Sequence, residues 1–140
     1  IVLIYIGKRV KDLKQLTRLD IGNGIETSYP PMLHIHDFPV SLTYLDMSNI
    51  NFENFGFGNF IQKLKNLDTL ILSHTRIRCI PLCPPSLRVL DISSNKIVHA
   101  LIILDTDEQI KPIMNLETLV IHGNKNIKFS KRIPLHILQF

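Results

Sequence analysis

The sequence predicts an α/β fold made of stacked repeats, with one short parallel strand in each repeat. The chain of 140 residues contains 21 Ile and 20 Leu but no Trp, and the pattern LxxLxL, with Leu, Ile, Met or Phe at its last position, recurs six times along it. Alternation of Leu or Ile with other residues places the aliphatic side chains on one face of a strand. Each unit buries too little apolar surface by itself, so the next unit has to cover it.

The six motifs define repeats of similar length. They start at residues 16, 42, 67, 87, 116 and 135, and are therefore 26, 25, 20, 29 and 19 residues apart. We expect five full repeats and a sixth truncated at the end of the sequence, in a single domain over residues 1–140. Because the sequence starts without Met or a signal-peptide pattern, we expect this domain to be a fragment of a longer protein.

The segments that precede the motifs fall into two classes. Three of them have a helix-like pattern: Arg9–Gln15, Asn59–Lys65 and Asp107–Asn115. The other motifs follow proline, at Pro39, Pro84 and Pro134. We predict that the side of the repeats opposite the sheet alternates between short helices and extended segments.

Position nine of each repeat, counted from the first Leu of the motif, lies where the chain turns away from the strand. Asn95 and Asn124 occupy it in repeats four and five, and Thr75 in repeat three. An Asn side chain can bond the backbone groups of such a turn, and Thr can replace it in part. Gly24 and Ile50 stand there in the first two repeats, with Asn one place earlier. We expect these two turns to be built differently.

On these motifs, the sequence resembles the leucine-rich repeat family over about residues 13–140. The closest matches are LDISSNKI at Leu90–Ile97 and LVIHGNKNI at Leu119–Ile127. The resemblance implies a curved, horseshoe-shaped solenoid, with the parallel sheet on its concave side and short helices or extended segments on its convex side. PPSLRVLDISSN at residues 84–95 also resembles Toll-like receptor ectodomains, and the proline-bearing unit Arg78–Leu87 resembles the short repeats of bacterial effector proteins.

Composition and the length of the apolar runs exclude several classes of protein. The hydrophobic content of 45% excludes a disordered acidic segment. Every uninterrupted apolar run falls well short of the roughly 20 residues that a membrane span needs. Two Cys residues cannot form a disulfide framework. The lack of an N-x-[ST] sequon and of a Cys-rich cap favours an intracellular location but leaves the compartment open.

Two groups of residues could carry metal or thiol chemistry. His34, His36 and Asp37 could offer nitrogen and oxygen ligands, but no further ligand is fixed by spacing. Cys79 and Cys83 form CxxxC rather than the CxxC of zinc or redox motifs, which favours two semi-buried structural thiols. We therefore expect no catalytic residue, metal or cofactor.

The densest basic run of the chain raises the possibility of a nucleic-acid partner. It comprises Lys8, Arg9, Lys11, Lys14 and Arg18. Aromatic side chains that could stack on bases are not interleaved with these residues. We expect a solvated surface here and no nucleic acid.

The concave face is the expected partner surface, because positions three, five and seven of the repeats point toward it. The candidate partner-binding residues are Tyr44, Asp46, Thr69, Ile71, Ser73, Val89, Asp91, Thr118, Val120 and His122. Apolar side chains such as Ile71, Val89 and Val120 among polar ones are typical of a protein-binding patch. Asp46 and Asp91 belong to LDxS motifs, which also have a purely structural interpretation.

These observations favour a non-enzymatic scaffold for protein–protein interaction. The alternatives are a Toll-like receptor-type ectodomain fragment that recognises a ligand, and the substrate-recognition domain of an effector ubiquitin ligase. Ile137, at position three of the sixth motif, is expected to point outward as well. Because Ile1–Ile6 and Leu135–Phe140 would leave apolar ends without polar caps, we also expect self-association through the ends.

Overall fold

The computed structural model covers the repeats from the first motif to the last. It describes residues 12–22, 38–53, 60–97, 115–125, 127 and 135–140. Several sequence predictions lie outside the described residues: the His34, His36 and Asp37 cluster, the Ile1–Ile6 end, the basic residues before residue 12, and most of the expected helix at Asp107–Asn115.

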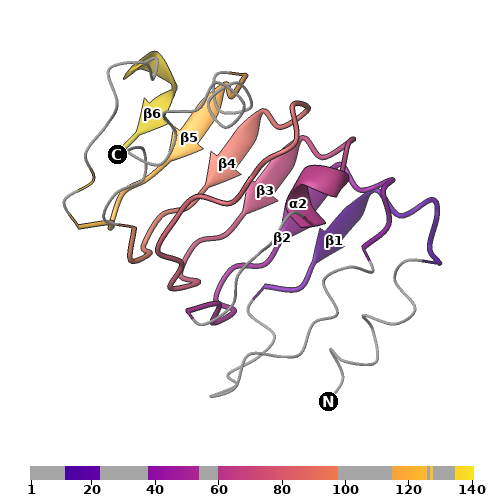
Figure 1. The fold of residues 1–140 in the computed structure, drawn as a ribbon, viewed down its shortest axis with the longest axis horizontal. Coiled ribbons are helices and arrows are strands. Elements are labelled where there is room, and N and C mark those ends of the chain that lie inside the picture. Colours follow the sequence, from indigo (N-terminus) through magenta and orange to yellow (C-terminus); the bar gives the residue numbers. More distant parts are fainter. Residues whose placement is uncertain (1–11, 23–37, 54–59, 98–114, 126, 128–134) are drawn as a thin grey trace.

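Six short strands form one parallel sheet in chain order (Figure 1). The strands are β1 (Arg18–Asp20), β2 (Tyr44–Asp46), β3 (Thr69–Ile71), β4 (Val89–Asp91), β5 (Thr118–Val120) and β6 (Leu138–Gln139). The register places the fourth residue of every motif in one row, from Leu19 to Leu138. The prediction of a parallel sheet with one strand per motif is confirmed, and sequential parallel neighbours are consistent with a repeat solenoid.

An apolar core covers one face of this sheet. In the second repeat, positions one, four, six, nine and eleven are Leu42, Leu45, Met47, Ile50 and Phe52, each exposed by 2% or less. The same positions are buried in repeats three and four. Burying each aliphatic side chain of this size contributes about 1.5–3 kcal/mol, so the column of Leu and Ile accounts for much of the stability.

The described parts of the connections between strands contain one short α-helix and several turns. The helix α2 (Phe60–Lys63) lies within the expected Asn59–Lys65, and its residues Phe60 and Ile61 are buried. Pro39 and Pro84, both buried, each begin a turn, in which their carbonyls accept hydrogen bonds from Leu42 N (3.2 Å) and Leu87 N (3.1 Å). Residues 12–15 form turns instead of part of a helix, so the described part of the Arg9–Gln15 prediction is wrong. Within the described ranges, no helix has the length and hydropathy needed to cross a membrane.

The sixth repeat departs from the sequence prediction at position three. Ile137 is only 2% exposed, so the expectation that it points outward is wrong. The reason is a 3-10 helix, η2 (Leu135–Ile137), which precedes β6 and turns this side chain into the core. Phe140, at position six, is 80% exposed, whereas Met47, Leu72 and Ile92 at that position are covered by the following repeat.

The turns after β2 to β5 share a backbone conformation at position eight. Asn49, His74, Ser94 and Gly123 have φ values of 61°, 56°, 53° and 72°. Gly and Asn adopt this left-handed region more readily than other residues. The Asn of repeat two, which the sequence places one position early, therefore meets a backbone requirement of position eight.

At position nine, Asn95 bonds two consecutive repeats. Its Oδ1 accepts hydrogen bonds from the backbone N–H groups of Thr75 (2.9 Å) and Ile77 (3.2 Å). Its Nδ2 donates to the carbonyls of Leu72 (2.7 Å) and Ile92 (2.9 Å), and the side chain is buried. The predicted role of this Asn is confirmed.

Asn124 repeats the arrangement one repeat later. Its Oδ1 accepts from Ile97 N, and its Nδ2 donates to the carbonyls of Ile92 and Ile121. Asn95 and Asn124 each bond the position-six carbonyl of their own repeat. The hydroxyl of Thr75 lies 2.7 Å from the equivalent carbonyl, that of Leu72, so Thr replaces this one bond, as predicted.

Candidate functional site

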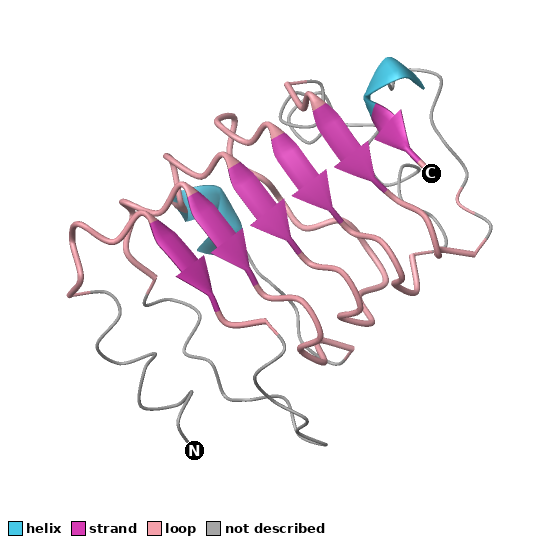
Figure 2. Ribbon diagram, turned by 180° about the vertical axis from the view of Figure 1, so that it is seen from behind, coloured by secondary structure: helices cyan, strands magenta, loops and turns pink. Residues whose placement is uncertain are grey.

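One face of the sheet is turned away from α2 and the apolar core (Figure 2). We call it the open face. Over strands β1 to β5 it carries the side chains of positions three and five: Arg18, Asp20, Tyr44, Asp46, Thr69, Ile71, Val89, Asp91, Thr118 and Val120. Those on β2 to β5 are half-buried, whereas Arg18 and Asp20 are exposed.

The open face brings together eight of the ten residues predicted from the sequence to bind a partner. The other two, Ser73 and His122, lie at position seven, in the turns that follow β3 and β5. Ser73 is half-buried and His122 is exposed. Two other position-seven residues, Ser48 and Ser93, are buried, so this position contributes unevenly to the surface.

Three aliphatic side chains lie on neighbouring strands of the open face. Ile71 pairs with Asp91, and Asp91 pairs with Val120, so all three lie in one row. Val89 lies on the strand between Ile71 and Val120, two residues before Asp91. We call Ile71, Val89 and Val120 the apolar patch. Each is half-buried, and Asp91 lies between Ile71 and Val120 in the row.

At the other end of the open face, Arg18 stacks on Tyr44. The guanidinium carbon of Arg18 lies 3.5 Å from the centroid of the Tyr44 ring. A contact of this kind at an exposed site contributes about 0.5–1 kcal/mol. The two residues pair directly across β1 and β2. The repeat pattern predicts Arg18 on this face, at the same position as Tyr44, but Arg18 was not among the residues predicted to bind a partner.

The aspartates of the open face have a structural role in the turns. Three of them accept a hydrogen bond at Oδ1 from the backbone N–H two residues later: Asp20 from Gly22 (3.0 Å), Asp46 from Ser48 (2.8 Å) and Asp91 from Ser93 (2.9 Å). This supports the structural interpretation of the LDxS motifs. In β3 and β5, Ile71 and Val120 take the same position without providing such a bond. Their exposure therefore does not follow from the needs of the turn.

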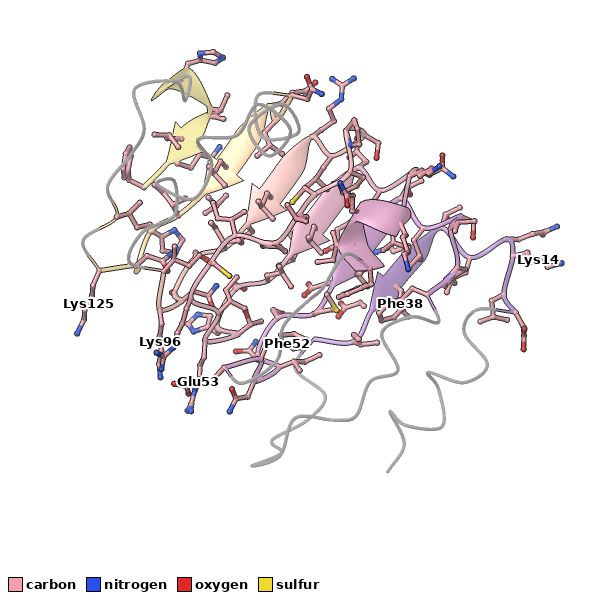
Figure 3. The ribbon with its side chains drawn as sticks, in the orientation of Figure 1. Lys14, Phe38, Phe52, Glu53, Lys96 and Lys125 are labelled. Atoms are coloured by element: carbon pink, nitrogen blue, oxygen red, sulfur yellow. The ribbon has the colours of Figure 1, made fainter. Side chains whose placement is uncertain are left out.

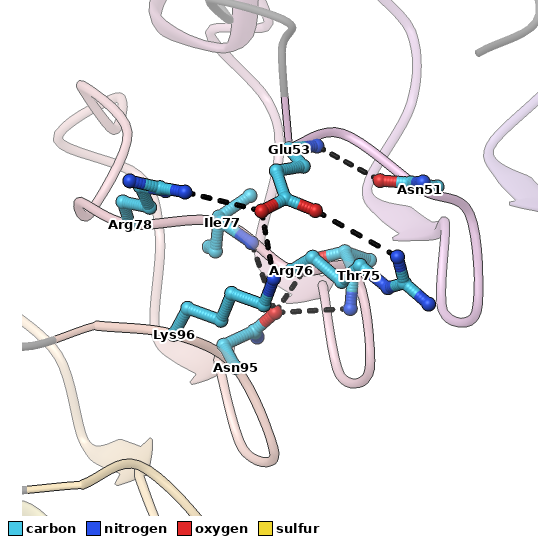
Figure 4. A network of polar contacts seen from close by, with 8 residues as sticks. All are labelled: Asn51, Glu53, Thr75, Arg76, Ile77, Arg78, Asn95 and Lys96. Carbon is cyan, nitrogen blue, oxygen red and sulfur yellow. Dashed lines mark hydrogen bonds and ion pairs between the residues drawn. The ribbon is translucent and has the colours of Figure 1, made fainter. Parts of the chain in front are cut away.

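A polar cluster centred on Glu53 lies away from the open face, in the turns after β2, β3 and β4 (Figure 4). Lys96 Nζ donates to Glu53 Oε1 at 2.7 Å, and Arg78 donates to the same oxygen at 3.1 Å. Arg76 lies 3.7 Å from Oε2. The hydrogen bonds from Lys96 and then Arg78 lower the pKa of Glu53 from 4.5 to about 2. Sequence reasoning did not identify this cluster.

The two thiols differ from the semi-buried pair that the sequence predicts. Cys79 is exposed and Cys83 is buried, and both are free. Cys83 Sγ donates to the Pro81 carbonyl at 3.3 Å, and burial raises the pKa of its thiol to about 12. A group with this pKa stays protonated at neutral pH, so Cys83 is a structural residue. Among the described residues, no three His, Cys, Asp or Glu side chains gather as metal ligands would.

Comparison of the sequence with models of protein families gave no match, and comparison with curated proteins gave no significant match.

Proposed function

We propose that this chain is a leucine-rich repeat solenoid that acts as a non-enzymatic scaffold and binds another protein through the open face. The repeated LxxLxL motifs, the sequential parallel sheet and the bonds of Asn95 and Asn124 at position nine support the family assignment. In a curved solenoid of this kind the open face is the concave side.

The apolar patch is the observation that carries the proposal. Ile71, Val89 and Val120 keep aliphatic surface in contact with water, on strands whose opposite face is already buried. A partner that covered this surface would gain about 25 cal/mol for each Å² of apolar area removed from water. Arg18 and Tyr44, residue types enriched at binding hot spots, lie on the same face with the polar residues that typically border such a patch.

The test replaces apolar patch residues and leaves the aspartates unchanged, because Asp46 and Asp91 stabilise their turns. The chain is immobilised, proteins retained from cell extract are quantified, and each retained protein is then titrated directly against the purified chain. The double variant Ile71→Arg and Val89→Arg is expected to weaken binding by at least about tenfold, because it places charge in the centre of the interface.

A matched control adds the same charge elsewhere. Gln15→Arg and Gln62→Arg are both at exposed positions outside the open face. This control is expected to bind as the unsubstituted chain does. Unchanged affinity of a folded Ile71→Arg and Val89→Arg variant for every partner would show that the open face is not the binding surface.

A further inference from the structure

The turns after β3, β4 and β5 each present a basic residue at position ten. These residues are Arg76, Lys96 and Lys125, each five residues after the end of its strand, and all are exposed. Because the sheet is parallel, the three turns lie along the same edge, the one formed by the carboxyl ends of the strands. Figure 3 shows Lys96 and Lys125 beside Glu53 along this edge, with Lys14 far from them.

Backbone hydrogen bonds hold neighbouring turns of this edge together. His74 N donates to the Ser93 carbonyl at 3.1 Å, and Ser94 N donates to the His122 carbonyl at 2.7 Å. The cations are therefore carried on adjacent turns whose strands are about 4.8 Å apart. Arg78, two residues after Arg76, adds a fourth cation. We call Arg76, Arg78, Lys96 and Lys125 the basic edge.

Glu53 contacts three of these cations, but its single negative charge does not balance their positive charges. Its side chain is 20% exposed, whereas those of Arg76, Arg78 and Lys96 are 59%, 70% and 48% exposed. The Glu53 side chain is thus less exposed than the three cations that it contacts. Arg has five N–H donors and Lys has three, so each cation has more donors than its contact with Glu53 uses. One negative charge against four positive charges leaves an excess directed toward solvent.

We propose that the basic edge binds an acidic peptide segment of a partner protein, running across the turns in an extended conformation. In such a peptide, side chains on the same side are about 7 Å apart, twice the rise of roughly 3.4 Å per residue. Long Arg and Lys side chains on adjacent turns can reach carboxylates at this spacing. Charge complementarity of this kind increases association rates and sets the orientation of the partner.

A peptide fits this edge better than a nucleic acid does. The described parts of these turns, at 49–53, 74–79, 94–97 and 122–125, contain no exposed Phe, Tyr or Trp, since Phe52 is buried. Single-stranded nucleic acids gain much of their binding energy by stacking bases on such side chains. Carboxylates need only the N–H donors that the basic edge provides.

The probe for the test is a fluorescein-labelled synthetic peptide of about ten residues in which Glu alternates with Ser, titrated by fluorescence anisotropy at about 50 mM salt, where screening is moderate. The triple variant Arg76→Gln, Lys96→Gln and Lys125→Gln is expected to bind it at least about tenfold more weakly than the unsubstituted chain. Circular dichroism checks that the variant is folded. Lys125→Glu alone, which leaves the Glu53 contacts intact, is expected to weaken binding in the same direction.

The matched control removes equal charge from the segments that precede the strands, at the opposite edge: Lys14→Gln, Lys63→Gln and Lys65→Gln, all exposed. It is expected to bind within about twofold of the unsubstituted chain, and the Ile71→Arg and Val89→Arg variant is expected to retain the peptide. Equal loss in the matched control would mean that net charge alone attracts the peptide. Tighter binding of an oligothymidine of the same charge, or full binding by Lys125→Glu and the triple variant, would also overturn the proposal.

Discussion

The turns after β2 and β4 occupy equivalent places in two repeats but fill position nine with opposite chemistry. Ile50 is 2% exposed and belongs to the apolar core. Asn95 is 8% exposed and forms hydrogen bonds at both ends of its amide. Both turns contain a left-handed residue just before this position, Asn49 and Ser94. The backbone path is therefore shared, although the buried side chain is apolar in one turn and polar in the other.

Position nine also supplies the acceptor for the position-eleven amide of the repeat before it, and Asn95 and Thr75 do so in different ways. Ile77 N, at position eleven of repeat three, donates to the side-chain Oδ1 of Asn95 at 3.2 Å. Phe52 N, the equivalent group in repeat two, donates to the backbone carbonyl of Thr75 at 2.8 Å. The turn thus requires an acceptor from the next repeat, and a side chain or a backbone group can supply it. At Asn95 the side chain supplies this acceptor, and at Thr75 the backbone carbonyl does.

The largest effect is expected from Asn95→Ala. This substitution leaves the buried N–H groups of Thr75 and Ile77 without their acceptor, whereas the Leu72 carbonyl keeps its bond from the Thr75 hydroxyl. Each buried unsatisfied group costs about 1–3 kcal/mol, so we expect unfolding free energy to fall by about 4 kcal/mol. Urea denaturation followed by circular dichroism measures this. Asn66→Ala, at an exposed Asn whose Nδ2 bonds the Val40 carbonyl, is the matched control and should cost less than about 1 kcal/mol. Equal losses in the two variants would contradict the assigned role.

Ile50→Ala is expected to cost about 3 kcal/mol through lost burial and the cavity that it leaves. Ile50→Val, which removes a single methylene, should cost about 1 kcal/mol. The same denaturation measurement gives both values. If the two substitutions cost equal amounts, the position would not be governed by packing, and the contrast with Asn95 would fail.

Thr75→Val tests whether position nine of repeat three holds the turn after β2 through its side-chain hydroxyl or through its backbone carbonyl. The Thr75 hydroxyl lies 2.7 Å from the Leu72 carbonyl and 3.0 Å from Asn95 Oδ1, and Val removes it with little change of shape. We expect a loss of about 1–2 kcal/mol. In native-state hydrogen exchange, the protection of the Phe52 amide should fall by no more than the unfolding free energy of the whole chain does, because its acceptor is the backbone carbonyl of Thr75. Selective loss of that protection would show that the hydroxyl holds this turn.

The smallest effect concerns Glu53, which joins the same turns from the solvent side. The pKa of its carboxyl is about 2 in the folded chain and 4.5 ordinarily, so its contribution to stability is complete above pH 4.5 and is lost as the pH falls toward 2. Glu53→Gln should therefore be less stable than the unsubstituted chain at pH 7, with a difference that shrinks between pH 4.5 and 2. Denaturation at a series of pH values measures this. A difference that does not change over that interval would contradict the ion-pair explanation.

Periodic residues made the strands predictable from the sequence. The Leu residues of the motifs fix both the strands and their register, because equivalent positions of stacked units have to lie side by side. The open face follows from the same alternation. It also places Arg18 and Tyr44 on this face, since they share position three in neighbouring repeats.

The Glu53 cluster and the sixth repeat were beyond this reasoning for physical reasons. Glu53 and Lys96 are 43 residues apart and occupy different positions in their repeats, so their contact depends on the exact path of two turns. Ile137 has the residue type and motif position of a strand residue, but the 3-10 turn at the start of the repeat changes the direction of its side chain. Neither feature has a local sequence signal.

The bonds of Asn95 have a mechanical consequence. Its amide is anchored to the carbonyls of Leu72 and Ile92, which belong to repeats three and four. Asn124 bonds the carbonyls of Ile92 and Ile121 in the same way, and so joins repeats four and five. In an array where each repeat contacts only its neighbours, such bonds strengthen these two interfaces. A force applied to the two ends of the chain would peel repeats away one after another, and the third, fourth and fifth would be released together as a single step.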